Sequence, residues 1–288
     1  MRKLVLIDFS WLYNKYYYVA KYSLSQEGII DRDKLESTLL RMLSQFLTLI
    51  KRSYQDVKVA LALDSPTSTL KNSKIFEGYK QNRNKEEKKE VYSFLNSILE
   101  QLVKTLDSKS FSFMKAKGYE ADQILAYVIK KYHEKYQIIL FSGDKDLLQL
   151  TAYKNVFLSD KFEKGHFIIK TDEEIFQKFK NSKGEDFTRI SSNKKDILKY
   201  RVFKGDVSDN LSPVYPRIRD KDIKEIIQNH WTGDEVLSEN YINEIIEDVR
   251  RNNIDLANKL EYNKDTWLRN YKIMDLYHVG EINMKRLK

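Results

Sequence analysis

Carboxylates that follow short apolar runs are the residues of this chain that could do chemistry. The acids that we single out are Asp8, Asp64, Asp144 and Asp146, together with the pairs Glu120/Asp122 and Asp206/Asp209. Oxygen ligands in excess of charge balance suit hard divalent cations such as magnesium or manganese. If the fold gathers these acids, they form a site for such cations. A two-metal phosphodiester hydrolase is therefore the first hypothesis.

The set of acids is more informative than any one of them. A single Asp at the end of a strand is more simply explained as a turn former or a helix cap. Several carboxylates packed together repel one another and raise one another's pKa, so they need cations to stay ionised near neutral pH. At this number of acids, two divalent ions fit better than one. Two ions can activate a water and stabilise the leaving oxygen without a protein nucleophile.

The apolar segments between these acids predict an α/β fold. VLI, VALAL and IILF are short aliphatic runs, typical of buried parallel strands. Apolar residues spaced three and four apart predict amphipathic helices over about 35–50 and 91–106. A third helix begins near Glu120 and Asp122. We expect a mostly parallel central sheet flanked by helices, with the acids beyond the carboxyl ends of the strands.

The texture of the sequence changes after about Thr171, where strands fade and charged helical stretches take over. We predict an α/β core over residues 1–180, which includes a basic segment at 68–90, and a smaller helical domain over 196–288. The last acidic pair belongs to this second domain. Residues 181–195 are mainly polar and predict a mobile loop or linker.

Composition narrows the class of protein. The chain has 288 residues, no cysteine and a formal charge of +9, with a pI near 9.2. The lack of cysteine excludes disulfides and thiolate zinc sites. A basic protein that encloses an acidic site is typical of phosphate binding around bridging cations. We find no apolar run long enough to span a membrane and no signal peptide, so we expect a soluble cytoplasmic protein.

Four acidic motifs, taken in order, resemble those of a known superfamily. They are LIDFS at 6–10, YEAD at 119–122, SGDKD at 142–146 and KGDVSDN at 204–210. This set is similar to the flap endonuclease and 5′-3′ exonuclease superfamily. The segments at 261–263 and 271–276 add a similarity to the ribonuclease H group of T-even bacteriophages. The resemblance implies a nuclease core of the PIN type with a helical C-terminal region.

The resemblance also implies roles for the acids. Asp8, Asp64, Asp122 and Asp144 would surround a first magnesium ion, and manganese would substitute for it. Asp146, Asp206 and Asp209 would serve a second ion directly or through water, while Glu120 would orient ligands or waters. The family usually has a second acid directly after the position of Asp122, where this chain has Gln123. We therefore expect altered occupancy of the second site.

Residues 71–90 read KNSKIFEGYKQNRNKEEKKE, and composition alone favours a solvated helix or a disordered charged segment. By resemblance, this segment is the arch of the family, which is mobile without nucleic acid. Lys80 and Arg83 lie three apart, so on a helix both could face one phosphate. We expect them to stabilise negative charge in the transition state, while Tyr79 stacks on an end base. Lys71, Lys74 and Lys85 would bind nucleic acid.

Family members commonly grip duplex phosphates through a glycine-rich hairpin after the last acids. The corresponding segment here, residues 211–221, has no glycine and two prolines, which remove amide donors. We therefore expect phosphate contacts to fall on the nearby basic side chains. These are Arg217, Arg219, Lys221 and Lys224.

The resemblance implies a magnesium-dependent 5′-3′ exonuclease and flap endonuclease with ribonuclease H activity, which removes RNA primers during phage DNA replication. Its implied partners are RNA-DNA hybrid, duplex or flap DNA, a phage single-stranded-DNA-binding protein and a sliding clamp. The protein would act as a monomer, in the host cytoplasm if phage-encoded. Two alternatives stay open: a PIN-type single-strand ribonuclease, and a nucleic-acid-binding protein that has lost catalysis.

Overall fold

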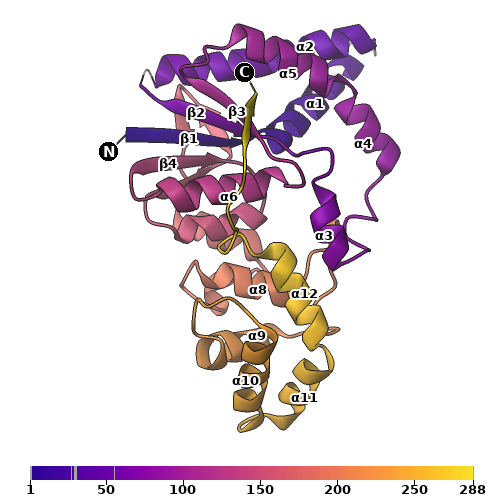
Figure 1. The fold of residues 1–288 in the computed structure, drawn as a ribbon, viewed down its shortest axis with the longest axis vertical. Helices are drawn as coiled ribbons and strands as arrows, with labels where there is room; N and C mark the ends of the chain where they lie inside the picture. Colours follow the sequence, from indigo (N-terminus) through magenta and orange to yellow (C-terminus); the bar gives the residue numbers. More distant parts are fainter. Residues whose placement is uncertain (1, 27, 29–30, 55, 288) are drawn as a thin grey trace.

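A six-stranded sheet forms the centre of the upper part of the molecule (Figure 1). The computed structural model describes residues 2–26, 28, 31–54 and 56–287, without the side chains of Lys85, Lys88 and residues 285–287. The strand order is β5-β4-β1-β2-β3-β8, and all neighbours are parallel except β3 and β8. The strands are β1 Arg2–Asp8, β2 Lys58–Ala62, β3 Phe111–Lys115, β4 Tyr136–Phe141, β5 Val156–Ser159 and β8 Lys285–Leu287. The predicted fold class is confirmed.

Helices cover both faces of this sheet because its central strand β1 is apolar on both sides. Val5 and Ile7 of β1 belong to one buried cluster, which includes residues of α1, α2 and α5. Leu4 and Leu6 face the opposite way into a second cluster, which includes α6. The bounds are α1 Phe9–Gln26, α2 Arg32–Ser53, α5 Leu95–Thr105 and α6 Ala121–Tyr132. The three predicted amphipathic helices are thus present.

The basic segment joins β2 to α5 and lies at the edge to which the parallel strands point (Figure 1). It consists of α3 Thr69–Ile75, a run of turns, and α4 Lys85–Val91, followed by the 3₁₀ turn η1 Tyr92–Phe94. We call residues 68–90 the arch. It therefore lies on the side of the sheet where the strand-end acids are expected.

Helices build the lower part of the molecule (Figure 1). They are α8 Asp196–Lys204, α9 Asp220–Glu225, the π-helix η6 Ile226–His230, α10 Glu239–Arg250, α11 Ile254–Tyr262 and α12 Lys264–Met274. The 3₁₀ helix η2 Asp146–Ala152 joins β4 to β5. Between β5 and α8 lie a β6–β7 hairpin (Lys161–Glu163 and His166–Ile168), α7 Asp172–Phe176 and the 3₁₀ turn η3 Gln177–Phe179. The α6-side cluster continues into α8, α10, α11 and α12. The division at 180/196 stays a prediction.

Residues 181–195 differ from the mobile linker that the sequence predicts. Phe187 and Ile190, at and beside the 3₁₀ turn η4 Phe187–Arg189, are fully buried. Arg189 binds the Asp220 carboxylate at 2.6 Å and donates to the Phe179 carbonyl at 2.7 Å. Two apolar side chains and one well-bonded arginine are enough to fix a segment whose composition is otherwise polar.

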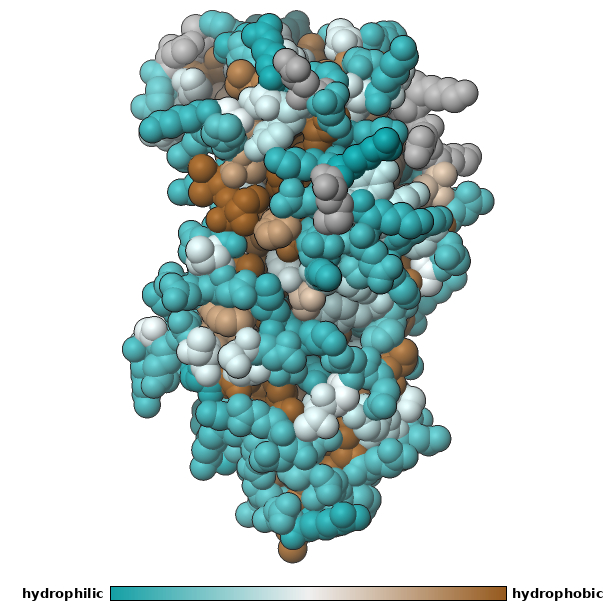
Figure 2. All heavy atoms as spheres, turned by 90° about the vertical axis from the view of Figure 1, so that its left-hand side faces the viewer, coloured by the Kyte–Doolittle hydropathy of each residue, from teal (hydrophilic) through white to brown (hydrophobic). Residues whose placement is uncertain are grey.

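The face at the amino end of β1 is mainly hydrophilic, with apolar side chains gathered in smaller areas (Figure 2). Such areas are ordinary on a folded surface. Among the described residues, no helix is both long and apolar enough to cross a membrane.

Candidate active site

Three acids meet where the parallel strands end, and we call Asp8, Asp64 and Asp144 the strand-end acids. Asp8 is the last residue of β1 and lies opposite Ala62 of β2 in the parallel register. Its carboxylate accepts hydrogen bonds from the Trp11 amide and from the Ser142 hydroxyl, both at 3.0 Å. The Ser142 contact links the end of β1 to the end of β4. This gathering of strand ends is what the apolar runs predicted.

Asp64 and Asp144 are also held by neutral groups. The Ala121 amide at the start of α6 donates to Asp64 Oδ1 at 2.8 Å. The Asp144 amide donates to the Ser142 hydroxyl at 3.1 Å, and Asp144 Oδ1 accepts from the Asp146 amide at 2.9 Å. No cationic side chain in the described part of the chain forms a salt bridge with these three carboxylates. Their charge is therefore not offset by the protein itself.

Electrostatics distinguish Asp8 within this group. Burial raises the pKa of Asp8 to about 7, and the nearby Asp144 and Asp64 charges add to the rise. The hydrogen bonds from Trp11 and Ser142 oppose it but do not outweigh it. In the absence of a bound cation, Asp8 would titrate near neutral pH.

Four of the other five acids lie against basic side chains, and we call Glu120, Asp146, Asp206 and Asp209 the cation-paired acids. Arg201 of α8, which is 8% exposed, bridges two of them. Its Nη2 donates to Asp146 Oδ1 and, at 2.7 Å, to Asp206 Oδ2. Sequence reasoning missed Arg201. The available signal was a single arginine between the apolar residues of α8, five positions before Asp206.

Arg201 does not affect its two partners equally. Burial raises the pKa of Asp146 to about 7, even though the Arg201 charge opposes that rise. For Asp206, burial is outweighed by hydrogen bonds from Ser208 and Arg201, and the pKa falls below its ordinary value. Asp206 therefore stays ionised at neutral pH, whereas Asp146 is partly protonated.

Lys80 and Arg83 of the arch meet the same acid. Lys80 Nζ lies 2.6 Å from Glu120 Oε1 and 3.7 Å from Asp209 Oδ2, while Arg83 Nη2 lies 2.6 Å from Asp209 Oδ1. The predicted helix is wrong here, because residues 77–82 form turns and Lys80 has a φ of 57°. A lysine in the left-handed region costs about 1 kcal/mol or more. The turn conformation still places both cations on one carboxylate.

Tyr79 is placed differently from the prediction. Its ring is 5% exposed in the α6-side cluster, and its hydroxyl donates to Glu120 Oε2 at 2.8 Å. The ring is therefore not available to stack on a base. Burial and the Glu120 charge raise the pKa of the Tyr79 phenol far above its ordinary value, so it remains a hydrogen-bond donor. In this arrangement it positions Glu120.

Gln123 closes the first turn of α6 with Glu120. The Gln123 Oε1 accepts from the Glu120 amide at 3.2 Å in a capping box. Gln123 is 7% exposed and lies beside Asp122. Burial and the Glu120 charge raise the pKa of Asp122 well above its ordinary value. The amide of Gln123 thus stabilises the helix start, and its effect on the second metal stays a prediction.

A cavity of about 360 Å³ separates the arch from α1. Asp64 and Glu120 line it on the side of the sheet, and Lys80 and Arg83 line it on the side of the arch. Contacts between α4 and α1 close it, since Tyr17 and Tyr18 donate to Glu90 at 2.9 Å and Glu87 at 2.7 Å. The predicted mobility of the arch stays a prediction. An anionic strand in this cavity would meet acids and cations on opposite walls.

The arrangement and the donor atoms of the acids bear on whether they suit divalent cations. In the part of the chain that the structure describes, no three acidic or histidine side chains are arranged closely enough to hold a metal ion as they lie. The strand-end acids nevertheless offer only oxygen donors and repel one another. Their chemistry fits a hard divalent cation. Among the cation-paired acids, Arg201 and Lys80 supply the positive charge instead. The metal assignments stay predictions.

The predicted nucleic-acid-binding side chains lie on two surfaces. Lys71 and Lys74 are exposed on α3, while the side chain of Lys85 lies outside the described residues. Arg217, Lys221 and Lys224 are exposed near α9. Arg219 differs, because it is bound to Asp222 at 2.8 Å.

Arg217 has a φ of 58°, a conformation that favours glycine. The hairpin thus keeps a left-handed turn although the sequence has no glycine there. This feature could not be predicted from the two prolines, which only constrain their own φ angles.

Comparison with known protein families now identifies the chain. Residues 3–180 match the family model of the 5′-3′ exonuclease N-terminal resolvase-like domain. The chain belongs to the 5′-3′ exonuclease family. Among curated relatives, it is 28% identical over 228 residues to a 5′-3′ exonuclease of Mycoplasmopsis pulmonis, which is 79% of this chain and 66% of the relative. A 5′-3′ exonuclease of Aquifex aeolicus is 31% identical over 141 residues, 49% of this chain and 44% of the relative.

Solved structures of a bacteriophage T5 protein share the fold of this chain. The T5 D15 protein co-crystallised with metal ions has a TM-score of 0.64 at 18% identity, over 96% of this chain and 90% of that chain. A T5 D15 flap endonuclease complex with DNA and metal ions has a TM-score of 0.59 at 18% identity, with the same coverage. The predicted superfamily is confirmed. The finer similarity to the T-even group stays a prediction.

Proposed function

We propose that this chain is a divalent-metal-dependent 5′ nuclease that hydrolyses phosphodiesters at the 5′ ends of RNA-DNA hybrids and of duplex or flap DNA. The observation that carries the proposal is the cavity in which the strand-end acid Asp64 faces Lys80 and Arg83 of the arch. Acids that need a cation on one wall and cations on the other suit a phosphodiester between them. A family whose curated members are 5′-3′ exonucleases supports this reading.

The strand-end acids would hold a first divalent ion together with Asp122, and Asp146, Asp206 and Asp209 would serve a second. Magnesium is our choice, with manganese as its substitute. When bound, such ions supply Lewis acidity to the attacking water and offset charge on the leaving oxygen. A T5 relative co-crystallised with metal ions supports metal dependence.

The arch residues have separate tasks. Lys80 is held by Glu120 and Asp209, and these charges outweigh its burial and raise its pKa, so it is positively charged at neutral pH. Arg83 is more open, with 44% of its side chain exposed. Lys80 would stabilise charge on the scissile phosphate, and Arg83 would guide that phosphate into the cavity.

Duplex would lie along the exposed cations near α9. Arg217, Lys221 and Lys224 are exposed there and form no ion pair among the described residues, so they would position the backbone without reading its sequence. The complex of a T5 flap endonuclease with DNA supports DNA as a substrate.

The biological setting is part of the proposal. A nuclease of this kind with ribonuclease H activity would remove RNA primers during phage DNA replication. It would act as a monomer in the host cytoplasm, alongside a single-stranded-DNA-binding protein and a sliding clamp. An RNA preference would depend on contacts to the 2′-hydroxyl, the feature that distinguishes the two strands.

The testing experiment compares 5′-labelled RNA-DNA hybrid, nicked duplex, flap duplex and free single strand, each with magnesium or EDTA. We expect magnesium-dependent 5′ products from the duplex substrates, lost in Asp144→Asn and kept in the surface control Asp255→Asn. Cleavage of free single strand at the same rate would favour the single-strand ribonuclease. Binding without cleavage in magnesium would favour the inert binder.

Lys80→Ala tests the role of the arch in the same assay. Loss of one preorganised donor typically lowers turnover about 10²- to 10³-fold. We expect a loss of this size on nicked duplex, with thermal unfolding measured beside it because Lys80 also pairs with Glu120. Wild-type turnover by a folded Lys80→Ala variant would remove Lys80 from the mechanism.

A further inference from the structure

The end of α12 and the residues directly after it lie against the acids, although the proposed function gives them no task. We call residues 270–277 the α12 segment. Three of its buried side chains line a small cavity of about 10 Å³: Ile273, Met274 and Leu276. Three acids of the site line the same cavity: Asp122, Asp146 and Asp209. The α12 segment therefore forms part of the wall behind the acids.

Gln149 of η2 joins the α12 segment to Asp146. Its side chain is buried, at 2% exposure. The Gln149 Nε2 donates to the Asp146 carbonyl at 2.9 Å and to the Met274 carbonyl at 3.0 Å. The Gln149 Oε1 accepts from the Leu276 amide at 3.1 Å. One amide side chain thus bonds the residue that carries the carboxylate and two residues of the α12 segment.

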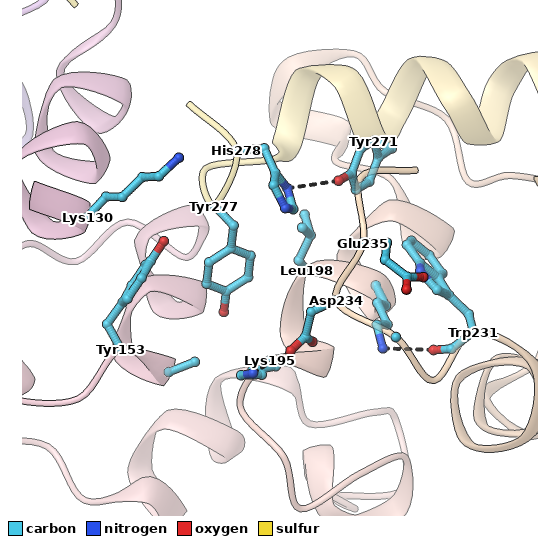
Figure 3. A pocket seen from close by; sticks show the side chains of 13 residues that line it. Lys130, Tyr153, Lys195, Leu198, Trp231, Asp234, Glu235, Tyr271, Tyr277 and His278 are labelled. Carbon is cyan, nitrogen blue, oxygen red and sulfur yellow. Dashed lines mark hydrogen bonds and ion pairs between the residues drawn. The ribbon is translucent and has the colours of Figure 1, made fainter. Parts of the chain in front are cut away.

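Tyr277 adds a second connection between the α12 segment and η2. Its hydroxyl donates to the Gln149 carbonyl at 2.5 Å. Its ring lies beside that of Tyr153, directly after η2, with the ring centroids 5.6 Å apart (Figure 3). Both the side chain and the backbone of Gln149 are therefore bonded to the α12 segment, so a shift of η2 would break contacts on both.

Asn270 connects the α12 segment to the remaining acids. It is fully buried, and its Nδ2 donates to the Val202 carbonyl at 3.0 Å and to the Ser212 carbonyl at 2.9 Å. Val202 is next to Arg201 on α8, and Ser212 follows the loop of the last two acids. One side chain thus bonds the helix that supplies Arg201 and the chain that leaves the acidic loop.

These hydrogen bonds stabilise the fold, as bonds between buried polar groups do. Their partners give them a second consequence, because the backbone groups that they reach belong to the segments that carry the second group of acids. A carboxylate that serves an ion must stay within about 0.5 Å of its position, which requires neighbours that are themselves fixed. Buried amides with both N–H groups bonded meet this requirement.

We propose that Gln149 and Asn270 are positioning residues for the second divalent ion, through which the α12 segment fixes the three acids assigned to that ion. The inference rests on the proposed function, in which those acids serve the second ion. Neither amide would touch the ion, since both act through the backbone of the segments that carry the acids. The α12 segment thereby acquires a task, although it contributes no acid to the site.

The test is a calorimetric titration of manganese into the chelator-treated full chain. Gln149→Met and Asn270→Leu keep the approximate shape of each side chain and remove its hydrogen bonds. We expect the second ion to bind roughly 10- to 100-fold more weakly in each variant, the usual effect of removing a group that orients a metal ligand. The affinity for the first ion should stay at the wild-type value.

Thr151→Val is the matched control. Thr151 also lies in η2 and is 3% exposed, but its hydroxyl donates locally, to the Leu148 carbonyl at 2.7 Å. The change removes a buried hydrogen bond that does not reach the α12 segment. It should lower the midpoint of thermal unfolding in EDTA and leave the affinity for the second ion unchanged.

A milder variant decides the matter if the two larger changes prevent folding. Tyr277→Phe removes only the hydroxyl that bonds the Gln149 carbonyl. It should weaken binding of the second ion by roughly 2- to 10-fold, as expected for one net hydrogen bond.

The outcomes separate this inference from the proposed function. A wild type that binds two ions, with the second affinity unchanged in the folded variants, would overturn the inference alone. Equal weakening of both ions, or the same weakening in Thr151→Val, would also overturn it, because either result would indicate a general loss of packing. A wild type that binds no second ion would refute the second-ion assignment of the proposed function and this inference with it.

Discussion

Asp8 accepts hydrogen bonds from an amide and a hydroxyl, whereas Asp206, in the neighbouring group of acids, accepts from Arg201. The two environments have opposite effects on the pKa. Burial raises that of Asp8 to about 7, while hydrogen bonds from Ser208 and Arg201 overcome burial and lower that of Asp206. The strand-end acids thus lack the internal cations that the cation-paired acids possess.

This difference indicates which acids depend on a bound ion. The chain offsets the second group with Lys80, Arg83 and Arg201, but it offers the first group only neutral donors. A divalent cation would therefore relieve repulsion at the strand ends, whereas at the second group it would have to displace or join an existing cation.

Arg201→Met should have the largest effect on stability. The change removes the cation from two partly buried carboxylates, and breaking such pairs usually costs about 3–5 kcal/mol. We expect a loss of this size in the free energy of unfolding in EDTA, partly recovered with magnesium. Arg219→Met, at a side chain 59% exposed and paired with Asp222, is the control and should cost less than about 1 kcal/mol. Equal losses in the two variants would contradict the contrast.

Asp8→Asn should stabilise the metal-free protein above neutral pH. The folded-state pKa of about 7 lies above the ordinary value of 3.8, so between these values the folded protein keeps a proton that the unfolded chain loses. Stability therefore falls as pH rises from about 4 to about 7, then levels off. The total is roughly 4 kcal/mol.

Unfolding in EDTA at pH 5 and pH 8 checks this. We expect the variant to be more stable than the wild type at pH 8 and to lose most of that advantage at pH 5. Magnesium should stabilise the wild type more than the variant. If the wild type and the variant showed the same pH dependence, the raised pKa of Asp8 would be refuted.

Gln123→Asp should have a moderate effect, because the shorter acid cannot keep the capping box with the Glu120 amide. Loss of a helix cap typically costs about 0.5–2 kcal/mol. Gln123→Glu keeps the reach and serves as the control. Thermal unfolding compares the two, and magnesium titration of each shows whether the added charge increases occupancy of the second site. A Gln123→Asp protein as stable as the wild type would show that the cap contributes little.

Arg83→Gln should change stability least, by less than about 1 kcal/mol, because 44% of the side chain is exposed and screening weakens its pair with Asp209. Its effect should appear in cleavage of nicked duplex instead. A loss of stability as large as that of Arg201→Met would mean that the exposure of an arginine does not determine how much its ion pair contributes to stability.

Much of the strand-end group could be predicted from the sequence. A buried parallel strand is a continuous apolar run, so the position after Ile7 or Phe141 is marked locally. The same holds for Glu120 and Asp122, which precede a clear apolar stripe. The sheet then brings these positions together by its topology alone.

The cation-paired group could not be predicted in the same way. Which cation meets which acid depends on turns and on packing between distant segments: Lys80 reaches Asp209 across more than a hundred residues because its φ is positive. Arg201 looked like one basic residue among many in a basic chain. The sequence predicts that Tyr79 faces a base, but its ring is buried in the core and its hydroxyl is bonded to Glu120.

The most direct test of the central contrast is a count of bound manganese ions by calorimetry, on the chelator-treated wild type and on Arg201→Met. In the wild type, we expect one ion to bind at the strand-end acids more tightly than a second ion. In Arg201→Met, we expect the affinity for the second ion to increase. Two ions of equal affinity in the wild type, unchanged in Arg201→Met, would contradict it.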